Sequence, residues 1–206
     1  PGYESAVFNT DIGNIGLTIT NFGTYGHGFS KWPNQPSCEY PIGSGIEHLY
    51  DGGLWIGAYY KSNSPDGAGR ITGPWVSTGI VDASSVSVRG GGLEFTNLPG
   101  AKVNERSSLL DSKFFSPQAI SHQDLFMEYS DTNKYLNNGE IITDHEPLGV
   151  VVRHEAYAWN YPFADFFVIM NYWIKNTTNK YIESVFVGLW TDAVVRNTNV
   201  TSPRTG

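Results

Sequence analysis

The chain has 206 residues, of which only 16% are charged, and its formal net charge is −7. No stretch of it concentrates Lys and Arg as a phosphate-binding face requires, which excludes nucleic acid as a partner. No apolar run approaches the roughly 20 residues that a membrane-spanning helix needs, so we expect no membrane span.

The composition is typical of many short strands joined by tight turns, because the chain combines 23 glycines with 14% aromatic residues. The first predicted strand covers residues 15–20, where apolar side chains alternate with Gly and Thr after a turn at residues 11–14. Residues 54–60 and 75–81 predict two further strands, separated by a turn-rich loop.

The middle of the chain has weaker patterns. Residues 85–88 and 93–96 predict short strands on either side of three consecutive glycines, which favour a hairpin tip or a wide bulge. Residues 103–123 lack alternation, and we expect a short helix there that begins at Ser116 or Ser121.

The clearest alternation lies in the last third of the chain. Residues 148–159 predict a strand with one buried face, on which His154 is expected as a hydrogen-bonded core histidine. Residues 166–174 are apolar on one face and mixed on the other, which suggests a central strand covered on both faces. Residues 185–190 predict a further strand. The polar segment 176–183 before it is long enough to cross between two sheets.

These elements predict an all-β fold, an antiparallel two-sheet β-sandwich (Ig-like or jelly-roll-like) with long connecting loops. Residues 1–206 would form a single sandwich domain or two closely packed β subdomains with a boundary near residue 100. Because the sequence stops shortly after a strong strand pattern, we expect it to be a fragment of a longer protein.

The loop at residues 131–140 has oxygen-bearing side chains at alternate positions, which resembles the start of a calcium loop. Asp131 and Asn133 are its weak candidate ligands. The sixth position is Leu136 where a calcium loop needs Gly, so we expect a hydrophilic hairpin loop and no cofactor. Structural calcium stays an alternative without further support. The five histidines show no metal-ligand spacing.

The sequence offers no catalytic motif. Ser44 lies between two glycines, but a nucleophile elbow needs glycine where Ile42 and Ile46 stand. Cys38 is the single cysteine and has no basic neighbours, so a buried structural thiol is expected. We therefore predict that the chain is not an enzyme; a hydrolase domain is a minor alternative, since the 20 acidic residues could supply an unrecognised carboxylate pair.

The tryptophans suggest a second function, because sugar rings stack on exposed aromatic side chains. Trp55, Trp173 and Trp190 lie in apolar strand patterns and are expected in the core. Trp32 and Trp159 lie in predicted loops and are the candidate carbohydrate-binding residues. Asn176 and Asn199 begin glycosylation sequons, which matter only in a glycosylating host.

A set of short segments recurs in a characteristic order along nearly the whole chain. They are NIGLTITN (14–21), FGTYG (22–26), YPIGSG (40–45), GLWIG (53–57), AISHQDL (119–125), EPLG (146–149), AYAW (156–159), FVIM (167–170), YWIKNT (172–177) and VGLWTD (187–192). Together they resemble the N-terminal region of very large, mostly uncharacterised secreted proteins, which bacteria export by a type IX route and which carry a C-terminal sorting domain. The resemblance implies an extracellular or cell-surface location and brings no established activity or catalytic residues.

Two functions follow as hypotheses. The first is a non-enzymatic extracellular structural or surface module, in one form a self-assembling fibre subunit that uses edge-strand pairing. Its partners would be copies of itself or other domains of the same polypeptide. The second is a carbohydrate-binding module of a larger secreted protein, with glycans as its partners.

Overall fold

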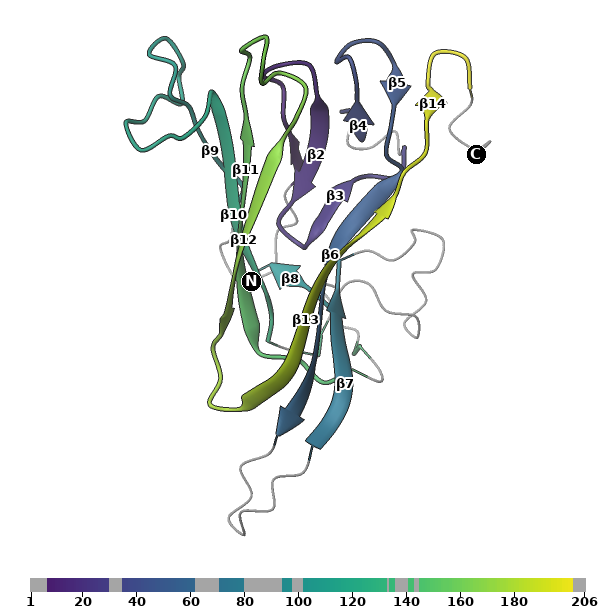
Figure 1. Cartoon of the computed structure of the whole chain (residues 1–206), viewed down its shortest axis with the longest axis vertical. Coiled ribbons are helices and arrows are strands. Elements are labelled where there is room, and N and C mark those ends of the chain that lie inside the picture. The colour runs from purple at the N-terminus through teal and green to yellow at the C-terminus, as the bar shows by residue number, and fades with distance from the viewer. Residues whose placement is uncertain are drawn as a thin grey trace.

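A computed structural model describes residues 7–29, 35–61, 71–79, 94–97, 102–132, 134–135, 141–142 and 145–201. Within these residues the chain is all-β, without a helix, and its strands form two antiparallel sheets (Figure 1). This confirms the predicted β-sandwich. The predicted strand at 85–88 and the three glycines after it lie outside the described residues.

The larger sheet has nine described strands, in the order β13-β6-β3-β2-β4-β5-β14, with β1 on β2 and β7 on β6. The long strands β6 and β13 pair along most of their length, which joins the front of the chain to its end. The strands are β1 (Val7–Asn9), β2 (Gly16–Thr20), β3 (Thr24–Gly26), β4 (Cys38–Glu39), β5 (Ile46–Glu47), β6 (Asp51–Lys61), β7 (Ile71–Thr78), β13 (Tyr181–Asp192) and β14 (Arg196–Asn197).

The smaller sheet has five described strands, in the order β12-β11-β10-β8, with β9 also on β10. The strands are β8 (Thr96–Asn97), β9 (Asn104–Arg106), β10 (Gln123–Asp131), β11 (Val150–Ala158) and β12 (Ile169–Asn176). β12 and β13 are consecutive in the chain but belong to different sheets, so the segment between them does cross the sandwich, as its length predicts.

The core lies between the two sheets. Leu54 and Ile56 of β6 are buried in one cluster with Leu125 of β10 and Val152 of β11. Each such side chain stabilises the fold by about 1.5–3 kcal/mol relative to an exposed position. The face of β11 that was predicted to be buried is buried, but the opposite face is not fully exposed, since Glu155 and Tyr157 are buried as well. The residues of the predicted face are Val150, Val152, His154, Ala156 and Ala158.

The predicted helix near Ser116 or Ser121 is wrong. At Ser116 the chain makes a single turn, closed by a bond from the Ala119 amide to the Ser116 carbonyl. After it, the amides of Ile120 and Ser121 donate to the Asp124 carboxylate and not to helical carbonyls, and β10 begins at Gln123. Side-chain bonds of this kind compete with a helix for the backbone donors.

The prediction of a central strand at residues 166–174 is also wrong. β12 starts at Ile169 and is the edge strand of its sheet, with β11 as its neighbour. Its outward face is exposed, including Ile169 and Trp173. The apolar residues on both faces therefore indicate an edge that the described residues leave open.

A row of aromatic rings crosses the inner face of the smaller sheet. Phe95 contacts Tyr129, Tyr129 contacts His154, and His154 stacks on Tyr172 of β12 with ring centroids 4.3 Å apart. His154 is buried as predicted, but neither of its ring nitrogens has a hydrogen-bond partner among the described residues. Burial lowers the pKa of His154 to about 3, so the ring is neutral.

We expect acid to weaken the fold through His154. The folded pKa lies below the ordinary value of 6.5, so this contribution to stability is complete above pH 6.5 and is lost as the pH falls toward 3. Between pH 7 and pH 5 the loss should be about 2 kcal/mol. Urea unfolding of His154→Leu at both pH values should show a pH dependence smaller by that amount. Parallel curves for wild type and variant would contradict the assignment.

Candidate functional site

Of the two candidate sugar-stacking residues, Trp159 is the one that lies within the described part of the chain. Trp32 lies outside the described residues. Trp159 follows β11 and is half-buried, with Tyr157 and Phe167 against it at 6.4 and 6.1 Å between ring centroids. Trp173, expected in the core, is instead 50% exposed on the outer face of β12, where the Arg153 guanidinium lies over its ring.

The segment after Trp159 forms further pairs of aromatic rings. Tyr161 and Phe163 are stacked, with nearly parallel rings, and both are exposed. Phe166 and Phe167 lie edge to face, and Phe167 also contacts Trp159. The only cue in the sequence is the density of aromatic residues between 157 and 167.

The two sequon asparagines are exposed, but each amide nitrogen already donates a hydrogen bond. Asn176 Nδ2 donates to the Lys180 carbonyl, and its Oδ1 accepts from Thr178, which closes the turn between β12 and β13. Asn199 Nδ2 donates to the Ser44 carbonyl. Both side chains thus hold turns in place.

Asp131, the weak calcium candidate, is fully buried at the end of β10 and its carboxylate is bound by the protein itself. One oxygen accepts from the Leu148 amide at 2.8 Å and from the Ser77 hydroxyl, and the other lies 2.9 Å from His145 Nε2. Asn133 lies outside the described residues. Where the chain is described, no three His, Cys, Asp or Glu side chains are grouped to hold a metal ion.

Ser77, Asp131 and His145 have the residue types of a hydrolytic triad but not its order. In a triad the imidazole lies between the hydroxyl and the carboxylate, so that it can remove the hydroxyl proton. Here the carboxylate lies between the other two groups. The arrangement anchors β7 and the segment before β11 to the end of β10.

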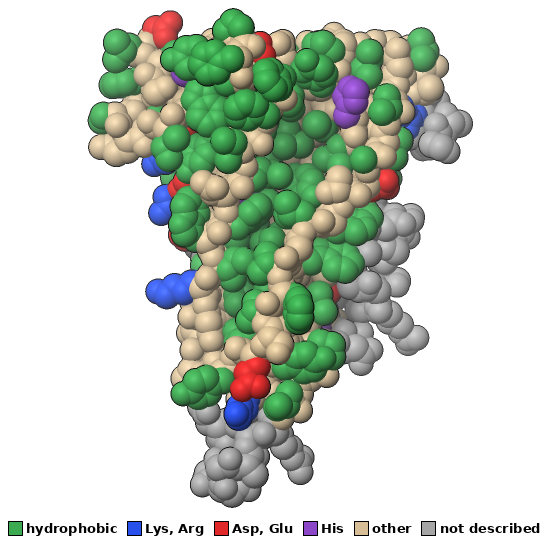
Figure 2. Space-filling model, in the orientation of Figure 1, with side chains coloured by type: hydrophobic (Ala, Val, Ile, Leu, Met, Phe, Trp, Pro, Cys, Tyr) green, Lys and Arg blue, Asp and Glu red, His purple; other side chains and the backbone are tan. Residues whose placement is uncertain are grey.

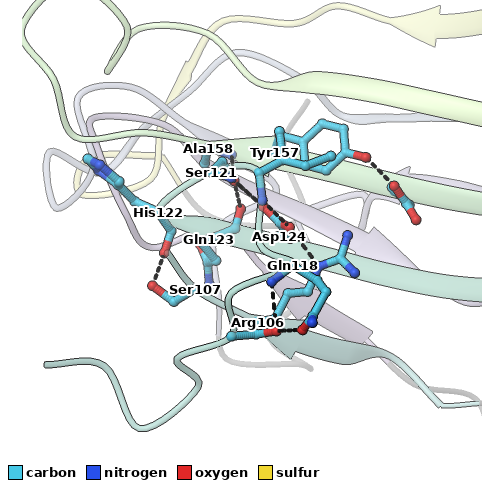
Figure 3. A network of polar contacts seen from close by, with 12 residues as sticks. Arg106, Ser107, Gln118, Ser121, His122, Gln123, Asp124, Tyr157 and Ala158 are labelled. Carbon is cyan, nitrogen blue, oxygen red and sulfur yellow. Dashed lines mark hydrogen bonds and ion pairs between the residues drawn. The ribbon is translucent and has the colours of Figure 1, made fainter. Parts of the chain in front are cut away.

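A second buried carboxylate, Asp124, organises the opposite end of the smaller sheet (Figure 3). It accepts from the amides of Ile120 and Ser121, from the Ser121 hydroxyl at 2.6 Å and from Arg106 Nε at 2.8 Å. The Ser121 hydroxyl in turn accepts from the Ala158 amide. The network therefore connects β9, β10 and β11.

His122 lies between Ser121 and Asp124 in sequence but does not join their chemistry. Its Nδ1 accepts from the Asn160 amide at 3.1 Å, and its ring contacts Tyr161. Figure 3 shows this ring turned away from Asp124. His122 precedes the first residue of β10, so the strand's alternation does not set the direction of its ring.

Cys38 is unsuited to nucleophilic chemistry. Burial, together with the nearby charge of Glu47, raises the pKa of its thiol to about 11. Burial also raises the pKa of Glu47, although the carboxylate accepts hydrogen bonds from the amides of Ser37 and Cys38. Ser44 lies in the turn before β5, and its hydroxyl accepts from the Ile46 amide.

The most unusual surface is the open edge, which we define as residues 185–189 of β13. Val185, Phe186, Val187 and Leu189 are between 51% and 72% exposed, although Val187 and Leu189 pair with the buried Ile56 and Leu54 of β6. Figure 2 shows hydrophobic side chains gathered along the middle of this face, between the positions of β12 and β13 in Figure 1.

A hollow of about 460 Å³ lies on the outer side of the larger sheet beside the open edge. Its lining is mainly apolar, and its volume lies in the range of small ligand sites, roughly 300–1,000 Å³. A side chain at Gly188 would meet no atom within 4 Å, so the space above this glycine is unfilled. The lining includes Trp55, Gly57, Tyr59, Val76, Phe186 and Gly188.

Comparison with known proteins gives no match to a protein family, to a curated protein or to a solved structure. Within the described residues no helix has the length and hydropathy to cross a bilayer. The site must therefore be judged from its chemistry alone.

We expect Asp124→Ala to destabilise the fold by about 3–5 kcal/mol, because it leaves Arg106 and the amides of Ile120 and the buried Ser121 without their acceptor. The matched control is Asp111→Ala, since Asp111 is an exposed aspartate in the loop that precedes β10. Chemical unfolding of both variants measures the difference. Equal, small losses would show that the Asp124 network is not structural.

We expect Cys38 to react slowly with iodoacetamide. At pH 8 its alkylation should be at least about tenfold slower than that of free cysteine, because the thiolate is scarce when the pKa is raised. Glu47→Gln removes the neighbouring charge and should speed the reaction. Mass spectrometry of timed samples gives the rates, and a Cys38 as reactive as free cysteine would refute the assignment.

Proposed function

We propose that this chain is a non-enzymatic structural module that assembles through its exposed strand edge, outside the cell or on its surface. The location follows from the resemblance to type IX-exported proteins. Partners would be further copies of the chain or other domains of the same polypeptide. A fibre is the extended form of such an assembly.

The open edge is the observation that carries the proposal. Soluble proteins protect edge strands with charges, prolines or short lengths, because unpaired backbone groups recruit other strands. β13 is 12 residues long, and its segment Val185–Leu189 contains neither charge nor proline. Apolar side chains that face the core side and remain half exposed mark an interaction surface.

The polar clusters give the proposal further support. Asp124, Asp131 and Glu47 are each held by amides or hydroxyls of the protein, and their bonds tie strands together. Groups engaged in this way stabilise the fold and are poorly placed to exchange protons with a substrate.

Self-association of the whole chain tests the proposal. The mass from light scattering should rise with concentration for the wild type, and Val187→Glu should keep the chain monomeric by placing a charge on the open edge. Leu110→Glu is the control, because Leu110 is exposed on a loop away from β13. Compact monomers at every wild-type concentration, or equal behaviour of both variants, would contradict the proposal. Negative-stain microscopy of the concentrated wild type distinguishes fibres from small assemblies.

A second candidate function, carbohydrate binding, is favoured by the aromatic side chains around Trp159. The stacked, exposed rings of Tyr161 and Phe163 offer a flat apolar surface to a sugar. A glycan array should then show binding that Phe163→Ala and Trp159→Ala both reduce, whereas Ile71→Ala, an exposed change on β7 of the larger sheet, leaves it unchanged. Binding that none of these changes affects, or no binding, would dismiss this function.

A further inference from the structure

We propose that the hollow on the outer side of the larger sheet is a binding site for an uncharged pyranose sugar. The site goes beyond the proposed assembly function and does not depend on it. It also lies on a different surface from the rings around Trp159, which follows β11 of the smaller sheet. The uncovered floor of the hollow, its aromatic walls and its unpaired hydroxyl groups carry the proposal.

The floor of the hollow is formed by glycines on neighbouring strands. In the ladder between β6 and β13, Phe186 pairs with Gly57, and Gly188 pairs with Trp55. A side chain at Gly188 would meet no atom within 4 Å, and one at Gly57 would meet only Val76, at 3.8 Å. Glycine inside a strand often marks a place where a ligand approaches the backbone closely. The sheet is thus left uncovered between the rings, and a flat ligand can lie against it.

Aromatic side chains stand around this floor. Trp55 and Tyr59 lie on either side of Gly57 along β6, and alternate residues of a strand share one face. Phe186, which is 72% exposed, adds a ring from β13. The faces of aromatic rings carry partial negative charge, so the C–H groups on the face of a pyranose ring pack favourably against them.

The hydroxyl groups of Tyr59 and Ser184, both at the hollow, have no hydrogen-bond partner within the described part of the chain. Ser184 lies in a β-bulge, where the pairing of β13 with β6 shifts register between Glu183 and Phe186. Its φ of 52° is uncommon for a residue other than glycine. Bulges often re-aim a side chain next to a site. Both hydroxyls are therefore available to a ligand.

The charges around the hollow favour an uncharged ligand. None of the described residues that line it is charged, and at its end the Glu183 carboxylate is already 3.4 Å from Lys61 Nζ. A charged ligand would therefore lack a counter-charge. A wholly apolar ligand would cover the Tyr59 and Ser184 hydroxyls without pairing them, which costs free energy. A pyranose avoids both losses, because it joins apolar C–H faces to a rim of neutral hydroxyl groups.

Saturation-transfer NMR with the whole chain tests the ligand class. The probes are the methyl glycosides of glucose, galactose, mannose and N-acetylglucosamine, and we expect at least one to bind with its ring C–H protons closest to the protein. N-acetylneuraminic acid, octanoate and indole represent a charged sugar, an apolar chain and a planar aromatic ring, and each should bind more weakly than the best glycoside. The proposal is overturned if no glycoside binds, or if one of these three binds more tightly than every glycoside.

Variants of the hollow test the place of binding. Gly188→Val puts a branched side chain into the empty space and should abolish binding of the best glycoside, while the fold is kept because no atom lies within 4 Å of the new Cβ. Tyr59→Phe and Ser184→Ala each remove one hydroxyl and should raise its Kd by about three- to tenfold. Circular dichroism confirms that each variant is folded.

Phe163→Ala, in the aromatic segment after Trp159, is the control and should leave the Kd unchanged. Binding that Phe163→Ala weakens and Gly188→Val leaves intact would overturn the site in the hollow and assign the sugar to that segment.

These outcomes are distinguishable from those of the proposed function. A chain that stays monomeric at every concentration but binds a glycoside through the hollow loses the assembly function and keeps this site. A chain that self-associates but binds no glycoside keeps the assembly function and loses this site.

Discussion

The ladder of backbone hydrogen bonds between β6 and β13 is the interaction on which the larger sheet depends. It joins residues 51–61 to residues 181–192, and β3 and β7 share the other edge of β6. Leu54 and Ile56 of β6 face the smaller sheet, and the residues that pair with them across this ladder are Leu189 and Val187. The same ladder leaves one edge of β13 exposed, so the source of stability and the proposed assembly surface belong to one strand.

The buried polar groups of the sandwich bond its loops to its strands. Asp124 and Asp131 lie at opposite ends of β10, and each gathers donors from segments far apart in the chain. Hydroxyl, imidazole and carboxylate groups that would suggest catalysis in a sequence are used here to close loops onto strands. Two buried carboxylates at the ends of a central strand stiffen the fold, and the proposed assembly would use that rigidity.

The sequence predicted the sandwich because alternation in β11 is strong and one face of it is buried. It could not separate a central strand from an exposed edge at β12, since apolar residues on both faces fit either case, and only the neighbouring strands decide. The Asp124 network was also beyond prediction. Its members, Arg106, Ser121 and Ala158, meet through long-range pairing that no local spacing reveals. Trp173 was assigned to the core because its strand is apolar, yet it lies on the outer face.

The crossing between β12 and β13 has a mechanical consequence. On this side the two sheets are linked covalently at one end only, and in Figure 1 the strands diverge from that turn toward the opposite end. No backbone hydrogen bond pairs a described strand of one sheet with a strand of the other. The turn held by Asn176 therefore keeps the two sheets together at this corner, while the core cluster and the bond from Ser77 of β7 to Asp131 of β10 hold them together elsewhere. A force applied along β13 would reach the smaller sheet through that turn and through these side chains, and not through a ladder of backbone bonds shared by the described strands.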